Sequence, residues 1–147
     1  MKKIALFPGS FDPFTIGHYS LVKRALSIFD EIIIAIGINT TKDNYSDIDK
    51  RKKNIEKIFE KENEKIKVIV YKDLTADIVE KEKATCILRG IRNTTDYEYE
   101  KNIADIHREL FNIETVFLFA DLKYAHISSS MIRELEKYGK NTSELRP

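Results

Sequence analysis

The sequence has few of the residues that distinguish small disulfide-linked chains and disordered chains from ordinary globular proteins. Its 147 residues include one cysteine, five glycines and three prolines, and 42% of them are hydrophobic. A lone cysteine offers no disulfide framework, and the low glycine and proline content excludes a low-complexity chain. We interpret that residue, Cys86, as a buried thiol of a reducing compartment. A chain of this size buries roughly 68–70% of its surface on folding, so we expect a single domain, residues 1–147.

Long hydrophobic runs are also missing. The apolar stretch that ends at Pro8 is shorter than the roughly 7–15 residues of a signal-peptide core. No later stretch reaches the roughly 18 apolar residues that suggest a membrane span. We therefore expect a cytoplasmic protein that has no membrane partner.

An excess of charge of either sign is absent as well. Twenty-five Lys and Arg residues balance 24 Asp and Glu residues, which gives a formal net charge of +1. Proteins that bind nucleic acid usually carry a basic patch or an overall basic field. The lysines between positions 50 and 67 are interspersed with glutamates, a pattern typical of a solvated helix face. We expect no nucleic-acid partner, and any anion site must be local.

Short β-branched runs alternate with amphipathic segments along the chain. The runs predict strands at 4–7, 31–38, 66–70, 85–88 and 115–119. The amphipathic segments predict helices at 18–29, 47–61, 76–83, 95–110 and 128–138. Strict alternation predicts the α/β class, with a single Rossmann-like domain, a five-stranded parallel sheet and helices on both faces. In such sheets, ligands bind at the carboxyl ends of the strands.

The loop after the first strand, Pro8–His18, is the first candidate site. It leads into a helix, whose first amides favour anions, and Gly9 and Gly17 allow close approach of a ligand to the backbone. It contains neither G-x-G-x-x-G nor G-x-x-x-x-G-K-[ST], which disfavours dinucleotide oxidoreductases and P-loop proteins. His18 lies in the first helical turn, where a protonated imidazole opposes the helix dipole unless an anion is near. The alternative is a capped turn with a structural histidine.

A second candidate is the segment Arg89–Arg92, which follows the fourth strand. Arginine suits bidentate phosphate recognition, and Gly90 between the two arginines lets a ligand approach the backbone. The alternative is that both arginines form surface ion pairs with the nearby acidic residues Asp96, Glu98 or Glu100.

The third candidate is Ser128–Ser130 at the start of the last helix, where hydroxyls and free amides can hold phosphate oxygens. The alternative is a helix cap and nothing more. Lys42, after the second strand, is a fourth candidate, or else a solvated lysine. Because these segments lie at one edge of the expected sheet, together they point to a phosphate-bearing ligand.

Four segments together resemble the phosphopantetheine adenylyltransferases, within the nucleotidyltransferase superfamily marked by a (H/T)-x-G-H motif. The segments are Pro8–His18, Arg89–Arg92, Asp96–Glu100 and Ile127–Ser130. The first is typical of the superfamily, whereas R-G-I-R followed by D-Y-E-Y-E is more specific to this enzyme family. The likeness spans nearly the whole chain. Ile16 and Arg133 stand where the family usually has Asn and Lys, and Ala125-His126 stands where Ser-Phe is common.

The resemblance implies transfer of the adenylyl group of ATP to 4′-phosphopantetheine, which yields dephospho-coenzyme A and pyrophosphate in coenzyme A biosynthesis. It further implies Mg²⁺ as cofactor, a homohexamer, and coenzyme A as a feedback ligand. No side chain is implied as a metal ligand.

The resemblance also implies residue roles. The implied catalytic residues are Ser10, His18, Lys42 and Arg92. The implied ATP contacts are Ser10, Phe11, His18, Gly90, Ile91, Arg92, Glu100, Tyr124, Ala125, His126, Ile127, Ser128, Ser129 and Ser130. The implied acceptor contacts are Ser10, Lys42, Thr75 and Arg89, with Lys42 and Arg89 on the acceptor phosphate.

Two other interpretations stay open at the level of sequence. Another member of the superfamily, such as a nicotinate-mononucleotide adenylyltransferase or a cytidylyltransferase acting on a polyol phosphate, shares the first motif, but the Arg89–Glu100 segment argues against it. A regulatory module that binds nucleotide without turnover is the second, and product formation distinguishes it from an enzyme.

Overall fold

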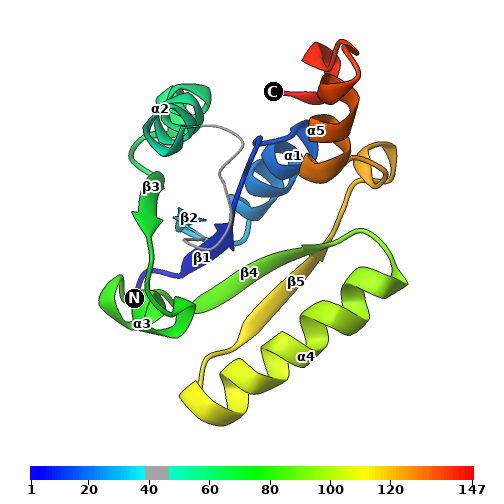
Figure 1. Cartoon of the computed structure of the whole chain (residues 1–147). Helices are drawn as coiled ribbons and strands as arrows, with labels where there is room; N and C mark the ends of the chain where they lie inside the picture. Colours follow the sequence, from blue (N-terminus) through cyan, green and yellow to red (C-terminus); the bar gives the residue numbers. More distant parts are fainter. Residues whose placement is uncertain (39–46) are drawn as a thin grey trace.

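The computed structural model describes residues 1–38 and 47–147, and within these ranges five β-strands alternate with five α-helices (Figure 1). The elements are β1 (Ile4–Gly9), α1 (Ile16–Ala25), β2 (Glu31–Gly37), α2 (Ile48–Ile58), β3 (Ile66–Tyr71), α3 (Thr75–Lys81), β4 (Cys86–Ile91), α4 (Thr94–Phe111), β5 (Thr115–Phe119) and α5 (Ser129–Lys137). Each matches a strand or helix that the sequence predicts.

The strands form one sheet in the order β3-β2-β1-β4-β5, and every neighbouring pair in the described chain is parallel. The chain therefore runs outward from β1 to β3, then returns to add β4 on the other side of β1. The predicted parallel sheet is confirmed. Because the connections after β1 and β4 diverge, the carboxyl ends of these strands flank the position where α/β proteins bind ligands.

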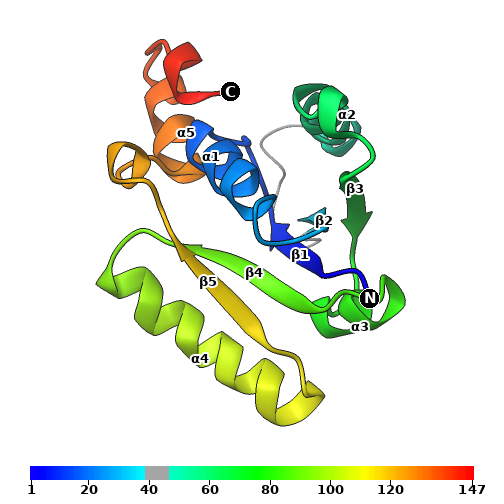
Figure 2. The same ribbon diagram turned by 180° about the vertical axis from the view of Figure 1, so that it is seen from behind.

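Strand β2 shows why its β-branched run has no polar alternation. Ile32, Ile34 and Ile36 face a core shared with α1 and α2, whereas Ile33 and Ala35 face a second core shared with α3. All five side chains are buried, and burying a side chain the size of isoleucine stabilises the fold by about 1.5–3 kcal/mol. Figures 1 and 2 show α1, α2 and α5 on one side of the sheet and α3 and α4 on the other, which confirms helices on both faces.

Strand β4 is longer than the sequence predicts. The predicted strand ended at Leu88 because Arg89 and Gly90 interrupt the apolar run, but both residues continue the ladder opposite Phe117 and Leu118 of β5. Gly90 also allows α1 to pack closely, since a Cβ there would lie 3.0 Å from Cδ1 of Leu21. Arg89 is therefore held on the sheet rather than in a loop.

Local side chains explain several element boundaries. Thr15 caps α1, which begins two residues earlier than predicted, and Asn93 and Ser128 cap α4 and α5 through their side-chain oxygens. Gly139 has φ of +75° just past α5, as its predicted role in ending that helix requires. Cys86 is buried in β4, and burial raises the pKa of its thiol to about 11, which confirms the prediction of a core thiol.

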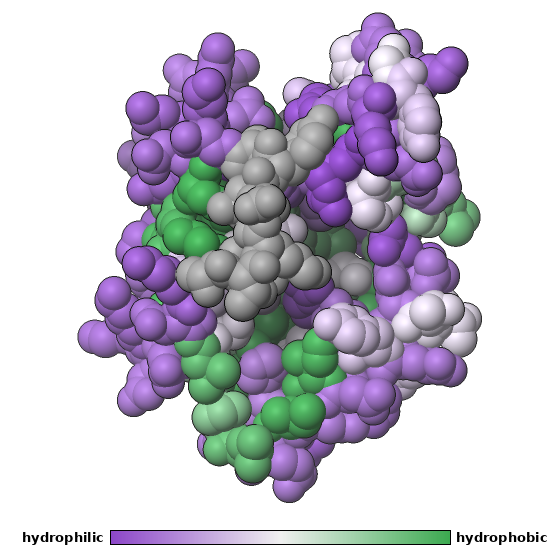
Figure 3. All heavy atoms as spheres, viewed as in Figure 1, coloured by the Kyte–Doolittle hydropathy of each residue, from purple (hydrophilic) through white to green (hydrophobic). Residues whose placement is uncertain are grey.

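The face drawn in Figure 3 is mainly polar, with hydrophobic residues gathered in more than one place. One of these areas is in the lower part of the view, over α4 and beside α3. The exposed apolar side chains of these helices and of the turn between β3 and α3 include Leu74, Ile106 and Leu110. Within the described ranges, no helix combines the length and the apolar character needed to cross a bilayer.

Candidate active site

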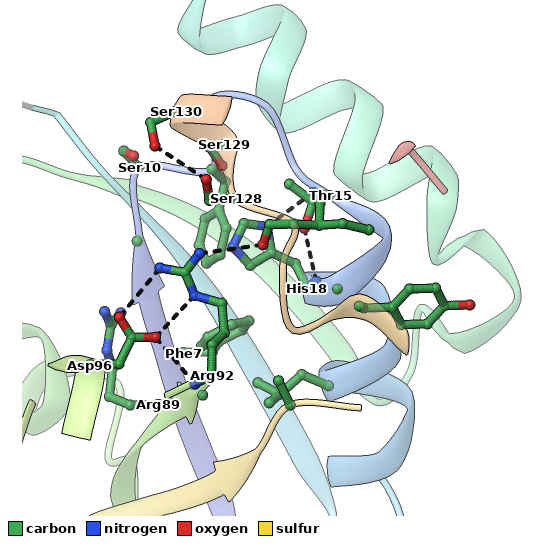
Figure 4. A pocket seen from close by; sticks show the side chains of 18 of the residues that line it. Phe7, Ser10, Thr15, His18, Arg89, Arg92, Asp96, Ser128, Ser129 and Ser130 are labelled. Carbon is green, nitrogen blue, oxygen red and sulfur yellow. Dashed lines mark hydrogen bonds and ion pairs between the residues drawn. The ribbon is translucent and has the colours of Figure 1, made fainter. Parts of the chain in front are cut away.

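A cavity of about 360 Å³ opens at the carboxyl ends of β1 and β4, which is within the size range of ligand pockets. Its walls come from the β1–α1 loop, the end of β4, the start of α4 and the start of α5. In Figure 4, Ser10 of the β1–α1 loop, His18 of α1, Arg92 of the β4–α4 connection and the serines at the start of α5 converge on it. The cavity thus lies at the carboxyl ends of the strands, where the sequence predicts a ligand site.

His18 completes a capping box at the start of α1. The Thr15 hydroxyl accepts a hydrogen bond from the His18 amide at 3.1 Å, and the Thr15 amide donates to Nδ1 of His18 at 3.0 Å. The imidazole fills the role that Glu or Gln has in the usual capping box. Since Nδ1 accepts, the proton of the neutral ring is on Nε2, which is left to donate to a ligand.

The surroundings keep this imidazole neutral. Burial first, and then the positive charges of Arg89 and Arg92, lower the pKa of His18 to about 3. Its ring also lies among aromatic rings, with centroids 5.0 Å from Phe11 and 5.3 Å from Phe14. Because the ring of His18 is neutral, it does not oppose the helix dipole as an imidazolium would. It offers a hydrogen-bond donor rather than a full positive charge.

The low pKa of His18 predicts a pH dependence of stability. The unfolded imidazole titrates at about 6.5, so protonation below that pH favours the unfolded chain, and the contribution of His18 is lost as pH falls from about 6.5 toward 3. His18→Gln keeps a capping-box residue but does not titrate. We expect thermal melts to show the variant gaining stability relative to the wild type between pH 7 and pH 4. Parallel losses in both proteins would contradict this assignment.

Arg92 lies in the short connection between β4 and α4 and reaches toward the residues before α5. Its Nε is 2.9 Å and its Nη2 3.3 Å from the two carboxylate oxygens of Asp96, and its Nη1 donates to the Ile127 carbonyl at 3.4 Å. The surface pairing with Asp96 that the sequence left open is therefore present. It also orients the guanidinium along the cavity wall, since Arg92 and Asp96 both line the cavity.

Arg89 forms the tightest ion pair of the site. Its Nε and Nη2 contact the carboxylate of Glu100 at 2.9 and 2.6 Å, and its Nη1 donates to the Pro8 carbonyl. Glu100 is buried, so this bidentate pair fixes the arginine firmly. The pair links β4, α4 and the end of β1 at one point.

The serines at the start of α5 have separate roles. Ser128 accepts from the Met131 amide at 3.2 Å, as a helix cap does, and its hydroxyl lies 3.2 Å from that of Ser130. Ser129 donates to the Pro13 carbonyl at 2.7 Å. The start of α5 is thus attached to the first loop, so the amides of the helix and the loop face one cavity.

A second cavity of about 220 Å³ adjoins the first. The two share Pro8, Gly9, Arg89 and Glu100, so the Arg89–Glu100 pair stands between them. Thr75 lines the second cavity, and its hydroxyl lies 3.0 Å from that of Tyr71. The arrangement has room for two ligands that meet near Arg89.

The described residues do not fit a protein-held metal. They contain no group of three or more His, Cys, Asp or Glu side chains placed to hold an ion. Magnesium keeps several waters and often binds through substrate phosphates. A Mg²⁺ ion at this site would therefore be held mainly by phosphates of a ligand.

Comparisons with known proteins agree with the geometry. The sequence model of the cytidylyltransferase-like family matches residues 6–135. The phosphopantetheine adenylyltransferase of Bacteroides thetaiotaomicron is 50% identical over all of this chain and 96% of its own length. That of Flavobacterium johnsoniae is 47% identical over all of this chain and 95% of its own length. The chain belongs to the phosphopantetheine adenylyltransferase family.

Solved structures share the fold at lower identity. A bifunctional NMN adenylyltransferase/ADP ribose pyrophosphatase from Francisella tularensis superimposes with a TM-score of 0.72 at 18% identity, covering 99% of this chain and 45% of that chain. A putative nicotinate-nucleotide adenylyltransferase from Vibrio parahaemolyticus has a TM-score of 0.64 at 22% identity, covering 99% and 94%. The nucleotidyltransferase fold is thus common to all three.

The residues that the phosphopantetheine adenylyltransferase resemblance implies are mostly brought together. The main cavity is lined by twelve of them: Ser10, Phe11, His18, Arg89, Gly90, Arg92, Glu100, Tyr124, Ile127, Ser128, Ser129 and Ser130. Thr75 lines the second cavity. Ile91, Ala125 and His126 line neither of these two cavities. Lys42 lies outside the described residues.

Two contributors to the site were not among the site residues that the sequence analysis named. Arg133 lines the main cavity and donates from Nη1 to the Asp12 carbonyl at 2.6 Å. Arg133 follows Ser129 by four residues on α5, and this spacing could have indicated that the two side chains lie on one face of the helix. Arg51 of α2 contacts the first loop across 41 residues of sequence, and no local pattern indicates that contact.

Proposed function

We propose that the chain transfers the adenylyl group of ATP to 4′-phosphopantetheine, releasing pyrophosphate and forming dephospho-coenzyme A. The observation that carries the proposal is the pair of adjoining cavities that share the Arg89–Glu100 wall. A transfer between two substrates requires both to be held with their reacting atoms close together. The larger cavity suits the nucleotide and the smaller one suits the acceptor.

The triphosphate is proposed to lie beside His18, Arg92 and the start of α5. The imidazole donates from Nε2, and the guanidinium of Arg92 supplies charge-assisted hydrogen bonds, since only part of its donor set is used by Asp96. The amides and dipole at the start of α5 favour a phosphate group at the same place. These donors are in position before the reaction begins, which is the arrangement that lowers a barrier electrostatically.

The acceptor phosphate is proposed to lie near Arg89, with the rest of the acceptor passing Thr75 in the second cavity. Arg89 keeps unused N–H donors beyond those bound by Glu100 and Pro8, so it can bind a phosphate without breaking its ion pair. Lys42 remains a proposed partner of the same phosphate. Ser10, at the end of the main cavity near the α5 serines, is proposed to contact both substrates.

The chemical step needs no general base. A phosphate monoester has its second pKa at about 6 and is largely dianionic at neutral pH. One of its oxygens attacks the α-phosphorus of ATP, and the bond from that phosphorus to the oxygen bridging to the β-phosphorus breaks. The electron pair leaves with pyrophosphate. The role of His18 and Arg92 is to stabilise the charge that develops on the phosphate oxygens.

Magnesium enters the proposal as the counterion of ATP. The described residues provide no dedicated cage, so ATP is proposed to arrive with the ion already bound to its phosphates. His18 is uncharged at neutral pH, so it does not compete with Mg²⁺ as a positive charge beside the phosphates.

Assembly and location complete the proposal. We propose a cytoplasmic homohexamer that coenzyme A inhibits by feedback. The exposed side chains of Tyr99, Ile106 and Leu110 on α4 support self-association, because apolar patches on a surface favour burial against a partner. Coenzyme A contains both an adenylyl and a pantetheine part, so the two adjoining cavities support its binding as well.

One assay tests the reaction. Purified protein receives Mg-ATP with 4′-phosphopantetheine, Mg-ATP with nicotinate mononucleotide, or Mg-CTP with glycerol 3-phosphate, in separate tubes. Pyrophosphate and the nucleotidyl product are measured in each, with heat-denatured protein as the control. We expect dephospho-coenzyme A in the first tube alone.

The other outcomes separate the alternatives. Product in the second or third tube would keep the fold and mechanism but overturn the acceptor. No product in any tube, with protein that still binds ATP, would overturn the enzyme and favour a nucleotide-binding module.

A further inference from the structure

Arg51 differs from its neighbours on the most cationic helix of the described chain. Lys50 and Lys53 of the same helix are exposed, whereas Arg51 is 5% exposed. It does not line either cavity of the candidate site. A buried arginine needs partners that compensate for its lost hydration, and two of the partners of Arg51 lie in the first loop.

Two contacts join Arg51 to that loop. Its Nη1 donates to the Ser10 carbonyl at 2.8 Å, and its Nη2 is 3.2 Å from Oδ2 of Asp12. Both side chains of this ion pair are buried, at 4% and 9% exposure. Ser10 lines the main cavity and Arg51 does not, so Arg51 contacts the backbone of a cavity residue without lining the cavity itself.

The other end of the same short stretch is held by a residue from a different helix. Arg133 of α5 donates to the Asp12 carbonyl at 2.6 Å, and Arg133 lines the cavity. The stretch from Ser10 to Asp12 is therefore fixed between one guanidinium from α2 and one from α5. Each guanidinium donates a hydrogen bond to one carbonyl oxygen of the stretch, so the negative end of each carbonyl dipole faces a positive charge.

We propose that Arg51 is a positioning residue for adenylyl transfer. It fixes the backbone of Ser10, and through Asp12 the loop that faces the phosphates, without touching a substrate. The inference rests on the proposed function for the reaction that it affects. Displacing reacting groups by about 1 Å can cost up to about 100-fold in rate, so loss of a contact outside the cavity can lower turnover strongly.

The planar fork of arginine is what the two contacts require. One guanidinium places separate N–H groups toward a carbonyl and a carboxylate, whereas the ammonium of lysine is a point charge on a flexible stem. Arg51→Lys keeps the charge that pairs with Asp12 but is not expected to hold both groups in register. This separates positioning from simple neutralisation of a buried carboxylate.

The test compares three variants with the wild type. Arg51→Lys retains the charge, the double variant Arg51→Met/Asp12→Asn removes both buried charges, and Lys53→Met is the exposed control on the same helix. We measure kcat, the KM for ATP and the melting temperature of each. The first two are expected to lose about 10- to 100-fold in kcat, with KM for ATP changed less than about threefold. Lys53→Met is expected to match the wild type in all three.

The outcomes are separable. A folded Arg51→Lys or double variant with wild-type kcat would overturn the positioning role. If the wild type forms no dephospho-coenzyme A, the proposed function fails first, and that failure is visible before any variant is compared.

Discussion

His18→Ala is expected to lower turnover by about 10²- to 10³-fold, equivalent to about 2.7–4 kcal/mol of transition-state stabilisation. The capping box commits Nδ1 to the Thr15 amide, so Nε2 is the single ring donor available to a phosphate oxygen. Alanine removes this donor and leaves nothing that can replace it. The loss should appear in kcat, because the charge on the phosphate oxygens is greatest in the transition state.

The measurement is steady-state pyrophosphate release at saturating substrates, with the melting temperature recorded for each protein. Lys101→Ala is a suitable control, since Lys101 forms an exposed ion pair with Asp105 on α4 and lines neither cavity of the site. A folded His18→Ala protein that keeps turnover within a few-fold of the wild type would remove His18 from the mechanism.

Phe14→Ala should lower the free energy of unfolding by about 3–5 kcal/mol, the usual range when a buried phenylalanine is truncated. Phe14 is 1% exposed, and its ring lies 5.3 Å from that of His18, 5.5 Å from Phe11 and 5.8 Å from Phe59. The substitution leaves a cavity between the first loop and α2. Because Phe14 also packs against the imidazole, we expect turnover to fall as well.

Equilibrium unfolding in urea measures this loss. Phe119→Ala is the same substitution at a side chain that is 75% exposed, and surface substitutions usually stay within about 0.5 kcal/mol. Phe14→Leu fills part of the cavity and should fall between the two. A loss below about 1 kcal/mol for Phe14→Ala would mean that the loop repacks freely around the gap.

Much of the fold follows from local patterns. The run Ile32–Ile36 requires burial on two faces, and a parallel sheet between two layers of helices provides it. The end of β4 could not be predicted in this way, because Arg89 and Gly90 break the apolar pattern while the ladder to β5 continues. Side-chain polarity indicates burial, whereas the length of β4 depends on pairing with β5 residues that are 28 positions away in sequence.

The site was predictable where its residues form short motifs. Ser10 and His18, like Arg92 and the serines of α5, belong to segments whose spacing indicates a phosphate site, and the structure brings these segments around one cavity. Arg51 and Arg133 were not, because each acts on a carbonyl group of the first loop from a distant helix. Contacts with a backbone carbonyl leave no signature in the residue that accepts them.

The order of the strands has a consequence for how the protein acquires its site. β1, β2 and β3 are consecutive and can pair by local crossovers, but β4 joins β1 across about 81 residues, as the bond from Arg89 to Pro8 illustrates. Closing a longer loop costs more conformational entropy, so we expect this pairing to form after the local crossovers between β1, β2 and β3. The main cavity lies between these two halves of the sheet. If ATP binds there as proposed, we expect binding to appear during refolding only once β1 and β4 have paired, and an intermediate in which only β1, β2 and β3 have formed should not bind ATP.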